Sequence, residues 1–173
     1  MHDKFRLGLL GAALSLALVA TSAPAATALL PEWRTAPTSQ RTAAGADARV
    51  VGLRMAEHAG FDRVVIDMRG RAAGYDIRYT ARLTYDGSGA PVRLKGRKKM
   101  ALVIHGARAH TLDGENLYTG PRRRQVDLPT LRGVAFTGDF EGQVSFGFAT
   151  SRRAPYRIFV LKNPSRIVVD WRH

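Results

Sequence analysis

Strict alternation of apolar and polar residues runs through Tyr75-Asp76-Ile77-Arg78-Tyr79-Thr80-Ala81-Arg82-Leu83-Thr84-Tyr85. Successive side chains of a β-strand point to opposite faces, so a period of two places the tyrosine, isoleucine and leucine side chains on one face. The polar side chains then lie on the other face. The stretch therefore predicts a strand with one buried face and one face in solvent.

The same alternation recurs before and after this stretch. The apolar members of four shorter runs are Val51, Leu53 and Met55; Val64, Ile66 and Met68; Val144, Phe146 and Phe148; and Ile167, Val169 and Trp171. We expect each of these strands to have one face in solvent. Two further runs, Met100–Ile104 and Tyr156–Leu161, are continuously apolar, which is typical of strands covered on both faces.

Turn-forming residues separate the apolar runs, at Asp86–Gly89, Gly138–Gly142 and Asn163-Pro164. Glycine supplies the positive φ of a tight reversal, and proline cannot donate to a ladder of strand hydrogen bonds. No helical spacing of apolar residues extends over three turns in the chain after Arg49. We predict an all-β domain, an antiparallel β-sandwich or partly closed barrel of about seven or eight strands, with a long loop over 107–130.

The N-terminal residues have the layout of a secretory signal peptide. Lys4 and Arg6 precede an apolar run from Leu7 to Ala20, and small residues follow it. A membrane-spanning helix needs about 20 apolar residues, so this run is too short for an anchor unless the signal stays uncleaved. We assign residues 1–28 to the signal, 29–48 to a flexible linker and 49–173 to the domain. Trp33 is expected to be loosely packed or exposed within the linker.

Composition limits the function classes. The 173 residues contain 27 Lys and Arg, 14 Asp and Glu and no Cys, which gives a formal net charge of +13. The missing cysteines exclude disulfides, thiolate metal sites and a cysteine nucleophile. Clustered cations attract anionic partners, and for an exported protein these are wall polymers such as peptidoglycan. A coding bias toward arginine would produce the same clusters without any ligand. Residues of two arginine-rich loops are the candidate contacts: Arg122, Arg123, Arg124, Arg152 and Arg153.

Two of the predicted strands share a sequence pattern. Arg63-Val64-Val65-Ile66-Asp67-Met68-Arg69 and Arg166-Ile167-Val168-Val169-Asp170-Trp171-Arg172 share one pattern, with Arg and Asp on one face and apolar residues on the other. We interpret Arg63, Asp67, Arg166 and Asp170 as structural charge pairs between neighbouring strands. The alternative is that this charged face is a ligand platform.

Enzyme motifs are absent. The chain has no Gly-x-Ser-x-Gly elbow, no phosphate-binding loop and no His-Glu-x-x-His. Ser88 lies between glycines in a turn, a position that serves backbone geometry. His105, His110, Asp113 and Glu115 could form a metal or acid/base site, but their spacing matches no recognised motif. We expect no cofactor, no metal and no catalysis. Nucleic acid is not an expected partner of an exported protein, and Tyr75, Tyr79 and Tyr85 are expected to face the core, away from Arg78 and Arg82.

The chain resembles the AMIN-like domain family, which is related to the AMIN domains of bacterial envelope proteins. The resemblance covers about residues 50–173 and rests on six segments in order: Phe61–Val65, Gly74-Tyr75, Asp86–Gly89, Thr137–Gly142, Arg153–Arg157 and Asn163–Asp170. It implies a β-sandwich that binds peptidoglycan without catalysis. Many such proteins are lipoproteins, but this chain lacks the cysteine that carries the lipid, so we expect no stable membrane anchor. Two alternatives stay open: a wall-modifying hydrolase, and a protein-interaction module that adds a partner's strand to a sheet edge.

Overall fold

The computed structural model describes residues 30–71 and 74–173, so the predicted signal peptide lies outside the described residues. Every regular element in the described part is a strand, and no helix there is long and apolar enough to cross a membrane. The strands are β1 (Thr38–Gln40), β2 (Ala48–His58), β3 (Phe61–Gly70), β4 (Gly74–Thr80), β5 (Lys98–His105), β6 (Ala107–Arg108), β7 (Arg123–Gln125), β8 (Leu131–Phe140), β9 (Gln143–Thr150), β10 (Tyr156–Leu161) and β11 (Arg166–Arg172).

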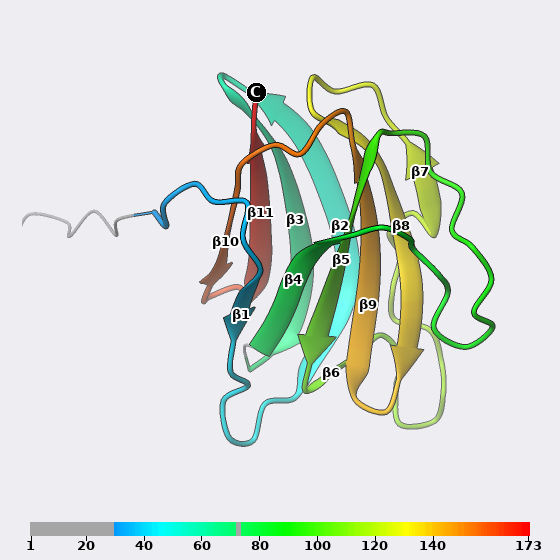
Figure 1. Cartoon of the computed structure of the whole chain (residues 1–173). Coiled ribbons are helices and arrows are strands. Elements are labelled where there is room, and N and C mark those ends of the chain that lie inside the picture. The colour runs from blue at the N-terminus through cyan, green and yellow to red at the C-terminus, as the bar shows by residue number, and fades with distance from the viewer. Residues whose placement is uncertain (1–29, 72–73) are drawn as a thin grey trace, which may run out of the picture.

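The strands form two sheets that face each other (Figure 1). One sheet has the order β1-β4-β5-β9-β8-β7, and the other has the order β10-β11-β3-β2-β6. All pairings are antiparallel except the short parallel contact of β2 with β6. The prediction of an all-β sandwich is confirmed, and the additional strands are the short ones at the sheet edges.

The main core lies between the sheets. Its largest fully buried side chains include Trp171, Tyr156, Phe146 and Phe148. The indole Nε1 of Trp171 donates to the Met100 Sδ atom of the opposite sheet at 3.0 Å, and the Trp171 and Phe148 ring centroids lie 5.1 Å apart. Burial of these aromatic groups supplies the main stabilisation of a domain that has no disulfide.

A second apolar cluster covers the outer face of the six-stranded sheet. It contains Leu83, Val92 and Leu94 from the segment between β4 and β5, together with Ala135 and Ala149 from the sheet. Consequently almost every residue of β9 is buried, and the prediction of a solvent face for this strand is wrong. The predicted strand through Tyr85 likewise ends at Thr80, because the following residues leave the sheet to form this cover.

A β-bulge changes the pattern of β2. The register with β3 shifts between Val50 and Gly52, so Val50 and Leu53 both point into the core. Val51 is only half-buried, although the simple alternation grouped it with Leu53. An extra residue in one strand inverts the side-chain faces on one side of the bulge, and periodicity alone does not reveal it.

The segment that the sequence assigned to a flexible linker contributes to both sheets. Arg34 exchanges two backbone hydrogen bonds with Tyr156 of β10, at 2.8 and 2.9 Å, and β1 then pairs with β4. Trp33 is half-buried, and the Arg157 guanidinium carbon lies 4.4 Å from the centre of its ring. The structure therefore corrects two expectations: residues from Trp33 to Gln40 pack on the sandwich, and Trp33 is part of that contact.

Candidate functional site

Three connections meet at one end of the sandwich. Lys98 at the start of β5 and Leu131 at the start of β8 are both register partners of Thr150, the last residue of β9. The Ser151 N–H then donates to the Thr130 carbonyl at 2.8 Å. The segment before β5, the β7–β8 loop and the β9–β10 loop therefore lie side by side, and the two loops are at the top of Figure 1.

An open groove of about 660 Å³ lies between these connections. We call it the basic groove and define it by its lining residues: Lys95, Gly96, Arg97, Gln125, Val126, Asp127, Arg132 and Ser151. Arg132 pairs with Asp127, whereas Lys95 and Arg97 are exposed and have no acidic partner within the described part of the chain. The basic groove therefore presents two uncompensated cations to a ligand.

Gly96 allows the lysine and the arginine to approach the sheet. Its φ is +139°, and a Cβ atom at this position would lie 2.9 Å from the Ala149 Cβ and 3.1 Å from the Thr150 carbonyl oxygen. The Lys99 ammonium closes the same turn, because it donates to the Leu94 and Gly96 carbonyls at 2.5 and 3.0 Å. Burial in this position lowers the pKa of Lys99. The turn is thus fixed by glycine and by a lysine that itself is not available for a ligand.

The opposite wall depends on Gln125 and Gly133. The Gln125 Oε1 atom accepts the Lys95 N–H at 3.2 Å, which joins β7 to the turn before β5. A Cβ atom at Gly133 would lie 2.8 Å from that Oε1 atom, so a larger residue would displace the amide. These contacts connect the two walls of the basic groove.

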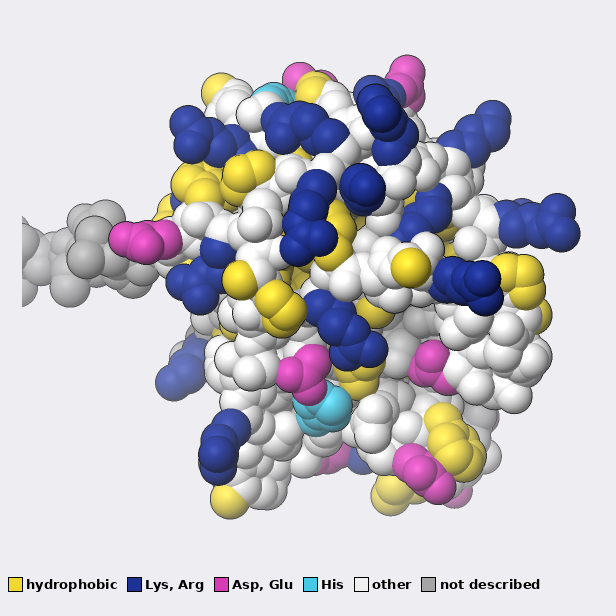
Figure 2. Space-filling model, viewed as in Figure 1, with side chains coloured by type: hydrophobic (Ala, Val, Ile, Leu, Met, Phe, Trp, Pro, Cys, Tyr) yellow, Lys and Arg dark blue, Asp and Glu magenta, His cyan; other side chains and the backbone are white. Residues whose placement is uncertain are grey.

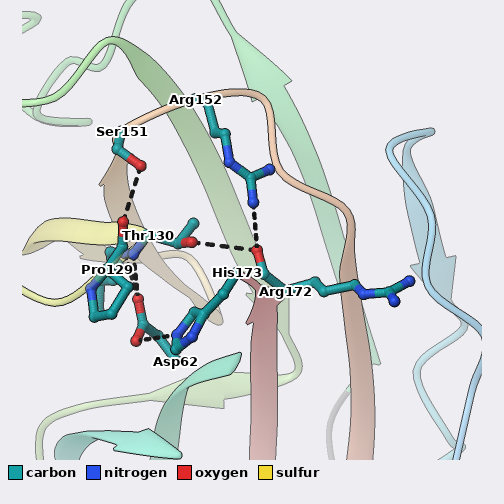
Figure 3. A network of polar contacts seen from close by, with 8 residues as sticks. Asp62, Pro129, Thr130, Ser151, Arg152, Arg172 and His173 are labelled. Atoms are coloured by element: carbon teal, nitrogen blue, oxygen red, sulfur yellow. Dashed lines mark hydrogen bonds and ion pairs between the residues drawn. The ribbon is translucent and has the colours of Figure 1, made fainter. Parts of the chain in front are cut away.

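Asp62 anchors the β7–β8 loop below the basic groove. Its side chain is fully buried, and the Oδ2 atom accepts the backbone N–H groups of Thr130 and Leu131, both at 2.7 Å. The Oδ1 atom contacts the Nε2 atom of His173 at 2.9 Å (Figure 3). The carboxylate thus satisfies two buried donors and joins the start of β3 to the C-terminal residue and to the loop.

The β9–β10 loop is tied to the same network (Figure 3). The Thr130 hydroxyl and the Arg152 Nη2 atom both donate to the Arg172 carbonyl, at 3.2 and 3.3 Å. The Ser151 hydroxyl donates to the Pro129 carbonyl at 3.2 Å. The positions of both loops, and hence the shape of the basic groove, therefore depend on contacts with the end of β11.

The candidate arginines do not form one site. Arg122 lies 4.7 Å from the Phe136 ring centre and donates to the Asn116 side chain, and Arg153 lies 4.9 Å from the Tyr79 ring centre. Arg152 donates to Arg172, as described above. Arg123 and Arg124 extend from the exposed edge strand β7. Three of the five are therefore engaged in contacts within the fold.

The sequence contains a signal for the groove cations. Lys95 and Arg97 belong to the cluster of positive charge before β5, and Gly96 separates them. A glycine between two cations indicates a tight turn that presents both, but only the fold shows that Arg132 lies beside them. Most of the Lys and Arg side chains visible in Figure 2 lie in the upper half of that view, on the side of this end of the sandwich.

The two strands that share the Arg and Asp pattern, β3 and β11, pair with each other. In the antiparallel register of β3 and β11, Arg63 lies opposite Asp170 and Asp67 lies opposite Arg166. Arg63 donates two hydrogen bonds to Asp170, at 2.7 and 2.9 Å. Asp67 instead accepts two hydrogen bonds from Arg54 of β2, at 2.7 and 2.8 Å. The structure therefore brings one predicted pair together and gives the second aspartate a different partner.

The residues of the alternative catalytic site are dispersed. The His105 Nε2 atom contacts Asp76 at 2.6 Å, whereas the His110 Nδ1 atom contacts Asp139 at 2.7 Å. Asp113 and Glu115 are exposed in the loop that follows His110. In residues 30–71 and 74–173, no group of three His, Cys, Asp or Glu side chains could hold a metal ion. Ser88 accepts the Ala90 N–H within its turn, at 3.3 Å.

The chain matches the model of a known protein family. The family model of the AMIN-like domain matches residues 48–173, from the first residue of β2 to His173. No curated protein matches the chain. The matched range includes all residues of the basic groove and every strand except β1.

Proposed function

Because the chain belongs to the AMIN-like domain family, we propose that it is a secreted, non-catalytic binding module of the bacterial cell envelope. Its basic groove captures peptidoglycan or another anionic wall polymer. The observation that carries this proposal is the pair of exposed cations, Lys95 and Arg97, which line an open groove without acidic partners among the described residues. The signal-like N-terminus supports export.

The chemistry of the basic groove suits a polymer with repeated negative charges. Arginine binds a carboxylate or phosphate through two parallel hydrogen bonds, and lysine adds a point charge. Gln125 and Ser151 supply polar groups that can bind sugar hydroxyls at the same surface. A groove that is open to solvent admits a continuous chain. Its charges are screened by salt, so binding weakens as ionic strength rises.

A wall-modifying hydrolase has less support. Its candidate residues form two separate His–Asp contacts, and Asp113 and Glu115 lie on an exposed loop. Glycosidase carboxylates must face each other across a cleft at a fixed separation. We therefore retain a binding role for this domain.

The test compares two double variants, each of which removes two positive charges. Lys95→Gln with Arg97→Gln removes both free cations of the basic groove. Arg41→Gln with Arg71→Gln removes two exposed cations at the opposite end of the sandwich, where Gln40 pairs with Tyr75. Fluorescence anisotropy with a labelled, soluble wall-polymer fragment measures affinity at low salt.

We expect the groove variant to bind at least about tenfold more weakly than the unmodified protein, because two charge-assisted contacts are lost. The control variant should lose much less. Equal losses in the two variants would indicate binding by net charge alone, and would contradict a role for the basic groove. Unchanged affinity of the groove variant would contradict it as well.

A further inference from the structure

The four sheet edges differ in length and chemistry. Among the described residues, β1 and β7 have three residues each and β6 has two, whereas β10 has six. Proteins usually protect an exposed edge by making it short or charged, and β7 is both. β10 reads Tyr156-Arg157-Ile158-Phe159-Val160-Leu161, which contains one charged residue and neither Gly nor Pro. It is the edge that lacks these protections.

The backbone hydrogen bonds of Tyr156 define which backbone groups of β10 are free. Tyr156 exchanges its two hydrogen bonds with Arg34 on the side away from β11. Backbone groups alternate between the two sides of a strand, so those of Ile158 and Val160 also point away from β11. No backbone partner of either residue occurs on that side in residues 30–71 and 74–173. Two N–H and two carbonyl groups are therefore available for a further strand.

The surroundings of this edge indicate what would pair with it. Phe159 is half-buried and Leu161 is 37% exposed, and both point to the outer face of the sheet, so they offer apolar contacts to a neighbouring strand. Arg34 lies at one end of the free edge, and Lys162 follows its other end; both are exposed. A second copy of this strongly basic chain would bring like charges together, whereas an acidic strand would compensate them.

We propose that the free edge of β10 binds an extended segment of another protein, apolar in its centre and acidic at its ends. Ile158 and Val160 form the backbone hydrogen bonds, and Phe159 and Leu161 contact the apolar side chains. Arg34 and Lys162 then pair with the flanking carboxylates. This mode of recognition uses main-chain bonds for affinity and side chains for specificity. The proposal does not depend on the basic groove, which lies at the end of the sandwich and shares no residue with this edge.

The experiment uses the ¹⁵N-labelled protein and a blocked octapeptide with a Val-Thr-Val-Thr centre between pairs of glutamates. At millimolar peptide, we expect the amide signals of Ile158 and Val160 to shift and their hydrogen exchange to slow by about tenfold. A peptide with lysines in place of the glutamates should produce neither effect. No protection of these amides by the acidic peptide, or equal protection by both peptides, would overturn the proposal.

Two variants at one position supply the control. Val160→Pro removes a free N–H without breaking the bonds from β10 to β11, since those are made by the alternate residues. Val160→Ala keeps the N–H. We expect Val160→Ala to retain the peptide-induced protection of Ile158 and Val160→Pro to lose it. Protection in both variants, or concentration-dependent shifts of the β10 amides without peptide, would contradict the proposed occupant; the latter would indicate pairing between copies of this chain.

Discussion

Arg63 and Asp170 face each other across β3 and β11 and are joined by two parallel hydrogen bonds of 2.7 and 2.9 Å. Asp170 is fully buried and accepts a third bond from Arg157 at 2.8 Å. The two guanidinium groups lie over aromatic rings, Arg63 at 5.0 Å from Phe61 and Arg157 at 4.4 Å from Trp33. A carboxylate that was expected on an open, charged face is thus covered by arginines and aromatic rings.

The free energy of unfolding should respond differently to the same substitution at Asp170 and at Asp67. Asp170→Asn leaves two guanidinium groups without their buried counter-charge, and we expect a loss of about 3–5 kcal/mol in the free energy of unfolding. Asp67→Asn affects a pair whose side chains are 28% and 63% exposed, so the expected loss is below about 1 kcal/mol. Urea unfolding measures both. Similar losses for the two variants would contradict the structural distinction between them.

Asp62 is expected to support both stability and the shape of the basic groove. Asp62→Ala leaves the Thr130 and Leu131 N–H groups without their acceptor, which costs about 3 kcal/mol or more in the free energy of unfolding. Amide hydrogen exchange should accelerate at these two positions before the core opens. Asp113→Ala, at an exposed loop position, is the control and should change neither quantity. Unchanged exchange at Thr130 in Asp62→Ala would show that the carboxylate does not hold the loop.

Trp33 gives a test of the N-terminal segment. Trp33→Ala removes the aromatic ring that covers Arg157, and we expect a loss of about 1–2 kcal/mol in the free energy of unfolding. Leu30→Ala, at a residue 49% exposed, should change stability by less than about 0.5 kcal/mol. If Trp33→Ala is as stable as the unmodified protein, the segment before β1 behaves as the flexible linker that the composition suggested.

Stability should fall in alkaline solution. Burial raises the pKa of Tyr75, Tyr79, Tyr118 and Tyr156 above the ordinary value of 10.0. The unfolded chain then loses phenolic protons first, so the stabilisation is complete below about pH 10 and is lost as the pH rises above it. Lys99 acts in the opposite direction, since its pKa is lowered by burial, but it is one group against four.

Urea unfolding at pH 8 and at successive values up to about pH 11 measures this dependence. Tyr118→Phe should make the decline shallower, because it removes one of the four phenols while keeping its ring packed against Phe136 and Phe146. A free energy of unfolding that stays constant to pH 11, or rises, would contradict the burial of these tyrosines.

The period of two predicted the sheets well, because it reflects which side of each strand meets the core. It predicted the alternating faces of β3 and, with the repeated Arg and Asp residues, the neighbouring positions of β3 and β11. The expected solvent face of β11 is wrong, because Val168 and Asp170 are buried as well. It did not predict where β4 ends, since Leu83 continues the alternation but packs on the opposite face of the sheet. Side-chain spacing contains no information about which sheet surface an apolar residue will cover.

The candidate site was less predictable for a related reason. Arg122 and Arg153 belong to arginine-rich segments, which are typical of binding sites for anions. Each of them, however, lies over an aromatic ring of its own domain. Arg132 became a groove residue only because the β7–β8 loop and the turn at Gly96 lie side by side. A free cation and a stacked cation look alike in sequence, and only the packing around them separates the two.

Co-sedimentation with purified sacculi, measured over a range of salt concentrations, tests the central claim most directly. We predict that the protein pellets with sacculi at low salt, that the bound fraction falls as salt is raised toward about 0.5 M, and that Lys95→Gln with Arg97→Gln reduces it more than Arg41→Gln with Arg71→Gln. Absence of pelleting at low salt, or pelleting that neither salt nor the groove variant changes, would contradict capture of an anionic wall polymer by the basic groove.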